Sequence, residues 1–329
     1  MTRGSLPIWA FLSLAVAFVA LGCGGGGGTS LTGSTGTTGT TGSTGTTATG
    51  GTSGTTGTTG SSGIPITTPQ IIFSRPGAGN KEQLYRMAVD GTGATVLTDT
   101  TANRSNGSVN EGLTILVYQT DEEGDNEIYR TSLSGGTPVN LTNHIANDYS
   151  PVISRSGNKI AFMSNRSGVA ALWVMNADGS SPIMISNMDG IDGCALNADG
   201  SKVVFSAAPA GIPQIYIANS NGTGIVNLSN DLGFFDTHPS FSPNGSLIVF
   251  LRDDAIYTMT ATGSGKTHVY THSDFTGFPA FTSDGSQIVF LGQISFAWDI
   301  LRVNANGTGF VNLTQTPGDE FRNSGYIGL

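Results

Sequence analysis

The chain has 329 residues, of which 37% are hydrophobic, 11% are charged and 48 are glycine, and it contains two cysteines. The hydrophobic content excludes a chain kept disordered by charge, and two cysteines exclude a scaffold held by several disulfides. Apart from Arg3, 13 lysine and arginine residues stand against 23 aspartate and glutamate residues, so the remaining charge is −10 and nucleic acid is not an expected partner.

The first residues have the features of a secretory signal. Arg3 precedes an apolar run over 8–21, which is shorter than the roughly 20 residues that span a bilayer. The run ends in VALGC, which resembles the lipobox of bacterial lipoproteins, although Ala20 stands where leucine is most frequent. The resemblance implies cleavage before Cys23 and acylation of that cysteine. We expect residues 1–23 to be a lipoprotein signal peptide; an uncleaved anchor and an ordinary secretory signal are the alternatives.

The next segment, residues 24–70, is expected to be a flexible linker. Its first 40 residues, 24–63, are almost entirely glycine, threonine and serine, which cannot form a core. A glycine-rich chain of that length has a root-mean-square reach of roughly 35 Å. The linker would hold the folded part clear of the membrane, either as a bare spacer or as an O-glycosylated tract.

From residue 71 onward the sequence repeats itself six times. Each unit contains a short apolar strand with an aromatic residue at its third position, and successive aromatic residues are about 40–45 residues apart. These residues are Phe73, Tyr118, Phe162, Phe205, Phe250 and Phe290. Asp-Gly and Asn-Gly pairs typical of tight hairpins separate the strands of each unit. The pattern predicts an all-β fold over 71–329, a six-bladed β-propeller of four-stranded antiparallel blades.

The two ends of the repeat region predict how the ring closes. The first unit starts with its second strand, at Ile71, and lacks the opening strand of the other units. An extra stretch, 320–329, follows the sixth unit and contains the apolar pair Tyr326-Ile327. We predict that this C-terminal strand completes the first blade and closes the ring, so that no strand edge stays open.

The repeat resembles that of the TolB-type propellers of bacterial envelope proteins. The motif is seen in DTHPSFSPNGSLIVF from Asp236 and in DYSPVISRSGNKIAF from Asp148. The resemblance covers about 71–329 and implies a propeller that works in the cell envelope. TolB carries an α/β domain ahead of its propeller and related prolyl-oligopeptidase-type enzymes carry a hydrolase domain, whereas here a linker precedes the propeller and the sequence ends with it.

Short motifs that would indicate catalysis are incomplete. The GSGKT sequence at 263–267 lacks the earlier glycine of a phosphate-binding loop and aligns with a hairpin of the other units. There is no G-x-S-x-G motif, and the four histidines lack metal-ligand spacing. We expect no catalytic residue, no metal and no cofactor. Cys194 is expected to be buried, and the acidic run 121–127 to be a solvated hairpin tip.

One set of charged residues recurs in register. Asp148, Asp192 and Asp236 stand at the same place before the opening strands of three units, and His238 lies close to the third of them. One interpretation is that they cap the turn into each strand. The other is an acidic ring at the channel mouth that binds a basic peptide or a hydrated ligand, with these four residues as the candidate binding face.

These observations favour a monomeric, lipid-anchored protein of the bacterial cell envelope, facing the periplasm or the exterior. Its propeller would serve as a non-catalytic scaffold for an envelope protein partner, and Cys23 would be the only contact with the membrane. The alternative is an oligosaccharide-binding or carbohydrate-active propeller that uses its central channel. An exposed apolar patch favours the first function, and a sugar or metal in the channel favours the second.

Overall fold

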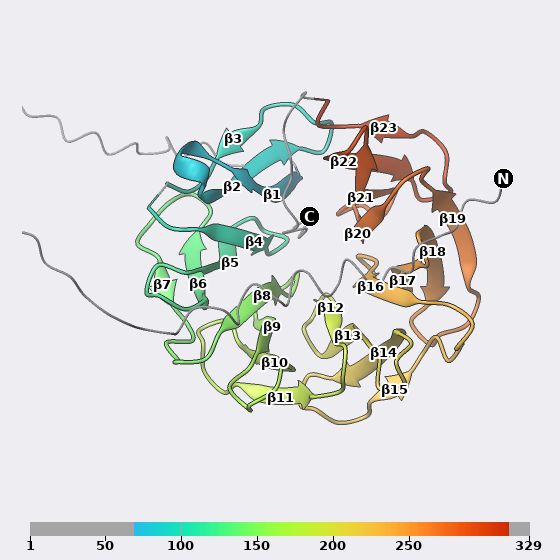
Figure 1. The fold of residues 1–329 in the computed structure, drawn as a ribbon, viewed down its shortest axis with the longest axis horizontal. Helices are drawn as coiled ribbons and strands as arrows, with labels where there is room; N and C mark the ends of the chain where they lie inside the picture. Colours follow the sequence, from blue (N-terminus) through green and yellow to red (C-terminus); the bar gives the residue numbers. More distant parts are fainter. Residues whose placement is uncertain (1–68, 100, 316–329) are drawn as a thin grey trace, which may run out of the picture. The chain divides into compact units, whose positions relative to one another are not determined.

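The computed structural model describes residues 69–99 and 101–315 of the chain. Their strands form six antiparallel sheets placed around a common axis (Figure 1). The only helix in these ranges is one turn of 3-10 helix, η1 (Ala78–Asn80), so none is long and apolar enough to cross a membrane. The predicted all-β, six-bladed propeller is confirmed.

Five of the sheets have four strands in sequence order, with the first strand nearest the ring axis and the last at the rim (Figure 1). Blade two comprises β4 (Arg104–Val109), β5 (Ile115–Thr120), β6 (Glu127–Ser132) and β7 (Val139–Asn140). Blade three comprises β8 (Asp148–Ile153), β9 (Lys159–Ser164), β10 (Ala171–Asn176) and β11 (Ile183–Ser186). Blade four comprises β12 (Asp192–Leu196), β13 (Lys202–Ala207), β14 (Gln214–Asn219) and β15 (Val226–Asn227). Blade five comprises β16 (Asp236–Phe241), β17 (Leu247–Arg252), β18 (Ala255–Thr260) and β19 (Thr267–Thr271). Blade six comprises β20 (Thr276–Phe281), β21 (Gln287–Ile294), β22 (Ala297–Asn304) and β23 (Val311–Asn312).

Blade one has three strands within the described residues: β1 (Gln70–Pro76), β2 (Glu82–Ala88) and β3 (Thr95–Val96). Strand β1 carries Phe73 of the repeated aromatic column, so it corresponds to the second strand of the other blades. Within the described residues the blade therefore begins with its second strand, as predicted. The stretch proposed to complete it, 320–329, lies outside the described residues, as do the signal peptide 1–23 and most of the linker 24–70.

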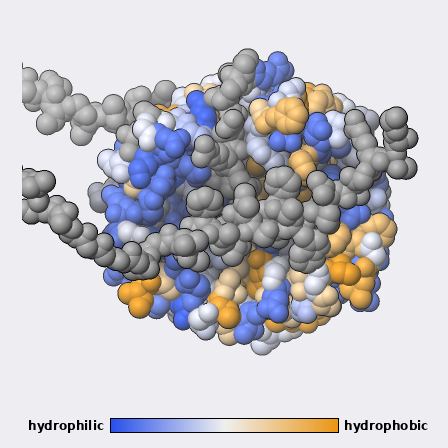
Figure 2. Space-filling view, viewed as in Figure 1, coloured by the Kyte–Doolittle hydropathy of each residue, from blue (hydrophilic) through white to orange (hydrophobic). Residues whose placement is uncertain are grey.

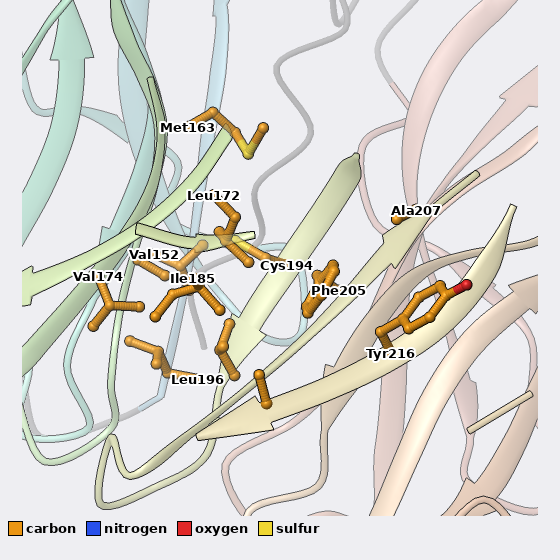
Figure 3. Packing of buried hydrophobic residues seen from close by; sticks show 13 residues of the cluster. Val152, Met163, Leu172, Val174, Ile185, Cys194, Leu196, Phe205, Ala207 and Tyr216 are labelled. Atoms are coloured by element: carbon orange, nitrogen blue, oxygen red, sulfur yellow. The ribbon is translucent and has the colours of Figure 1, made fainter. Parts of the chain in front are cut away.

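Hydrophobic clusters join every blade to the next. Six clusters are present, one between each pair of neighbouring blades, including one that joins blade one to blade six through Ile71, Phe73 and Leu291. Figure 3 shows the cluster between blades three and four, in which Leu172 faces Cys194. Cys194 is buried as expected, and the six repeated aromatic residues are buried as well. Burying a large apolar side chain contributes about 1.5–3 kcal/mol, so these clusters stabilise the contact between neighbouring blades.

The repeated Leu-Thr and Leu-Ser pairs have a structural role. In four blades the hydroxyl of the last residue accepts a hydrogen bond of 2.8–3.0 Å from the backbone amide of an apolar residue in the third strand. These hydroxyls belong to Thr98, Thr142, Ser229 and Thr314. The short fourth strand is thereby fixed to the blade although few ladder bonds hold it. The GSGKT sequence lies in the turn between β18 and β19, so it is a hairpin as predicted.

Candidate interaction surface

The antiparallel blades give the ring two distinct faces. Face A is formed by the loops that lead into the innermost strands, the turns that join second and third strands, and the adjoining strand halves. Backbone hydrogen bonds connect these pieces, for example from the Asp253 amide to the Phe235 carbonyl at 2.8 Å. Face B carries the remaining turns, between first and second and between third and fourth strands. All four residues of the predicted binding face lie on face A.

Two of the three recurring aspartates are engaged inside the protein. Asp148 has no exposed surface and accepts a hydrogen bond from the Arg166 guanidinium at 2.5 Å. Asp236 is equally buried and binds Arg252 through both carboxylate oxygens, each at 2.8 Å. Ion pairs at the start of the innermost strands therefore occupy these two carboxylates and withdraw them from solvent.

Asp192 differs from the other two, because its side chain is 48% exposed. Its carboxylate lies 3.5 Å from Nε2 of His238, whose ring packs edge-on against Phe278 at 4.2 Å between centroids. Burial and, to a smaller extent, the Asp192 charge raise the pKa of the neighbouring Tyr149. The structure thus brings Asp192 and His238 together, while Asp148 and Asp236 stay in separate ion pairs.

His238 belongs to a feature that recurs in each of the five innermost strands that the structure describes. Each strand has a register shift near its start, at a residue with a φ between 50° and 71°. These residues are Asn106, Ser150, Gly193, His238 and Phe278. Such bulges redirect side chains, and the positive φ is unfavourable for residues other than glycine. Neighbouring bulges touch, because Asn106 Nδ2 lies 3.4 Å from the Ser150 hydroxyl and His238 packs on Phe278.

Charge is divided unequally between the two faces. Within the described residues, face A carries 16 carboxylates, those of Glu82, Asp99, Asp121, Glu122, Glu123, Asp125, Glu127, Asp148, Asp189, Asp192, Asp231, Asp236, Asp253, Asp254, Asp274 and Asp299. Its five cationic side chains are those of Arg75, Lys81, Arg104, Arg166 and Arg252. Face B carries five carboxylates, those of Asp90, Glu111, Asp178, Asp199 and Asp284, and seven cations, those of Arg86, Arg130, Arg155, Lys159, Lys202, Lys266 and Arg302. The formal charges are −11 on face A and +2 on face B.

Residues 121–126 of the acidic run form the turn between β5 and β6, as predicted, whereas Glu127 begins β6 and is buried, so the expectation of a solvated tip is wrong for this residue. The carboxylates of the run have local partners: Asp121 accepts hydrogen bonds from Asn103, and Glu122 pairs with Arg104 at 2.9 Å. Burial raises the pKa of Glu127, which accepts hydrogen bonds from Thr142 and from the backbone amide of His144. Across the described ranges, no group of three or more histidine, cysteine, aspartate or glutamate side chains could hold a metal ion.

Face A also carries exposed apolar side chains in the loops that enter blades five and six. Leu232, Phe234 and Phe235 lie in the loop before β16, and Phe275 lies in the loop before β20. We call these four residues the aromatic patch. Figure 2 shows hydrophobic groups at the lower right of the ring, where β15 and β16 lie in Figure 1, and mainly hydrophilic residues over blade two. The sequence interpretation missed the patch, although phenylalanine directly before the opening strands of blades five and six was a signal for it.

Comparisons with known proteins agree with the fold. The sequence pattern of the TolB beta propeller domain matches residues 111–255 and 150–324. The structure is similar to TolB from Acinetobacter baumannii, with a TM-score of 0.65 and 18% identity over 74% of this chain and 63% of that chain. It is also similar to a putative TolB from Agrobacterium tumefaciens, with a TM-score of 0.61 and 16% identity over 74% of this chain and 87% of that chain.

An enzyme structure shares the fold as well. An oligogalacturonate lyase in complex with manganese gives a TM-score of 0.51 and 13% identity over 76% of this chain and 74% of that chain. No curated protein matches the chain at a significant level. Identities of this size establish the architecture alone. The family pattern, however, covers more than half of the sequence, and its position coincides with the blades, so this chain belongs to the TolB β-propeller family.

Proposed function

We propose that this protein is a lipid-anchored scaffold of the bacterial cell envelope that docks another protein on face A and performs no catalysis. The observation that carries this proposal is the aromatic patch, which is exposed on the more acidic face of a rigid ring. Exposed apolar groups on an otherwise well-packed protein are typical of protein–protein contact surfaces. Membership of the TolB propeller family supports a location in the envelope.

The position of the buried ion pairs also supports a docking role. Asp148–Arg166 and Asp236–Arg252 fix the first residues of two innermost strands, and the loops of face A leave from these points. A contact surface whose loops are already ordered loses less conformational entropy on binding. The partner's side chains would meet Asp192, His238 and the aromatic patch.

The membrane anchor is tested by replacing Cys23 with serine. A serine cannot be acylated at the lipobox position, and two or three acyl chains are needed for stable anchoring. We expect the C23S protein to move from the membrane pellet to the soluble fraction after cell fractionation, with the wild-type protein as control. If the C23S protein still sediments with membranes, Cys23 is not the anchor.

The docking role is tested by crosslinking from each face in native membranes, where face A should capture the partner.

A further inference from the structure

The aromatic patch is a part of face A that the core does not explain. The exposed fractions are 61% for Leu232, 40% for Phe234, 38% for Phe235 and 47% for Phe275. Burying such side chains in an interface is worth about 1.5–3 kcal/mol each, so leaving them in water is unfavourable unless a partner covers them. The loops that carry them lead into neighbouring blades, which places them on adjoining parts of the ring.

The buried side chain of Gln214 holds the longer loop of the patch, the one before β16, in place. This side chain is 1% exposed, and its amide nitrogen donates to the backbone carbonyls of Asp231 at 2.9 Å and Phe234 at 3.2 Å. Its amide oxygen accepts the backbone amide of Asp231 at 2.7 Å. A buried side chain that bonds both ends of the loop fixes its conformation, so the phenylalanines are presented in a defined arrangement.

Carboxylates surround the patch. Asp253, Asp254 and Asp274 are exposed beside it, and the Phe235 amide donates to the Asp253 carboxylate at 3.2 Å. Partial burial and the charge of Asp253 raise the pKa of Asp254, which fits a crowded group of like charges. The nearby cation Arg252 is already paired with Asp231 and Asp236. The negative charge of these carboxylates would repel an anionic membrane or nucleic acid and would attract a cation.

The chain itself shows how a cation binds at this place. The Arg252 guanidinium lies 4.5 Å from the centre of the Phe234 ring while it pairs with carboxylates on the same face. Arginine combines ion pairing with stacking on an aromatic ring, and both interactions gain strength when water is excluded. The outer surface of the patch offers the same two kinds of group, aromatic rings and carboxylates, to a second arginine.

We propose that the aromatic patch, with Asp253, Asp254 and Asp274, binds a cationic segment of another protein that carries arginine or lysine together with apolar residues. This proposal rests on the docking function proposed above and specifies the chemistry of the partner. This composition matches the surface, because apolar side chains would cover the patch while cations reach the carboxylates beside it.

The test uses the full-length protein in detergent and a fluorescent octapeptide of alternating arginine and leucine, with alternating glutamate and leucine as the control peptide. Binding is followed by fluorescence anisotropy at two salt concentrations. We expect the basic peptide to bind and the acidic control peptide not to bind. Binding of the basic peptide should be weaker at the higher salt concentration. The variant D253N/D254N/D274N should lose about tenfold or more in affinity, because three charge contacts are removed. The variant F235S/F275S should weaken binding by a similar factor.

The matched control is D90N/D178N/D199N, which makes the same change in net charge on face B. Asparagine already occupies the corresponding turn positions at Asn221, Asn306 and Asn244, so this variant should fold and bind within about twofold of the wild type. Thermal unfolding verifies that every variant is folded. If D253N/D254N/D274N and D90N/D178N/D199N lose equal affinity for the basic peptide, net charge alone attracts the peptide. That result would overturn the proposal. Self-association of the chain through the patch, seen by sedimentation, would also overturn it.

The two proposals fail in different ways. If face A crosslinks to a partner in membranes but the basic peptide does not bind, the cationic chemistry is wrong and the docking function stands. If the crosslinks come from face B, the docking surface itself is wrong.

Discussion

Replacing Arg252 with methionine is expected to lower the free energy of unfolding by about 3–5 kcal/mol, the usual effect of leaving a buried charge without its partner. Asp236 has no exposed surface, and Arg252 donates to both of its carboxylate oxygens. Methionine keeps much of the side-chain volume, so the loss reports mainly on the charge. Urea unfolding of the wild type and of R252M measures the difference.

Two further variants separate the charge from other effects. Arg130 is half-buried and donates to the backbone carbonyl of Ala177 at 3.2 Å, so R130M should cost about 1 kcal/mol, the loss of a single hydrogen bond. In the double variant D236N/R252M the buried carboxylate charge is also removed, only the partly exposed Asp231 loses its cation, and part of the lost stability should return. If R252M lowers the free energy of unfolding by less than about 1 kcal/mol, the Asp236–Arg252 pair does not hold the innermost strand β16 in place.

Deleting residues 320–329 is expected to remove several kcal/mol of stability and to broaden the thermal transition. In the described residues, blade one has three strands, and β1 corresponds to a strand that pairs on both sides in the other blades. An unpaired strand edge weakens the hydrogen-bond ladder of blade one. A ring that is not closed also loses the cooperativity between its first and last repeats.

Calorimetry of the full chain and of the truncated chain measures this effect. Deletion of residues 24–63, which cannot contribute to a core, is the control and should leave the transition unchanged. An unaltered transition after removal of 320–329 would refute closure by the C-terminal strand.

The fold could be predicted because its signals are local and repeated six times. Phe162 and Phe205, for example, stand in equivalent second strands and are fully buried, as their period predicts. The hairpin turns follow from Asp-Gly and Asn-Gly pairs, whose positive φ is seen at Gly179 and Gly222. Such patterns depend on neighbours within a few residues, so a single sequence is sufficient to recognise them.

The surface could be predicted only in part, because charge pairing depends on contacts across strands. Asp148, Asp192 and Asp236 are equivalent in sequence, yet an arginine from the next strand or turn meets only the first and the third. The aspartate in blade four faces His238 of blade five instead. The aromatic patch involves only the loops that enter blades five and six, so its residues lie outside the sixfold pattern that predicts the fold.

Site-specific photocrosslinking distinguishes face A from face B as the docking surface. A photoreactive phenylalanine analogue is placed on face A at Phe275 or Leu232, and on face B at Phe310 or Ile225, all exposed in the structure. Cells producing each full-length variant are irradiated, and adducts are isolated from native membranes. We predict that the two face A positions give the same discrete adduct and that the face B positions give none. The same adduct from face B alone, or from both faces with equal yield, would show that face A is not the docking surface.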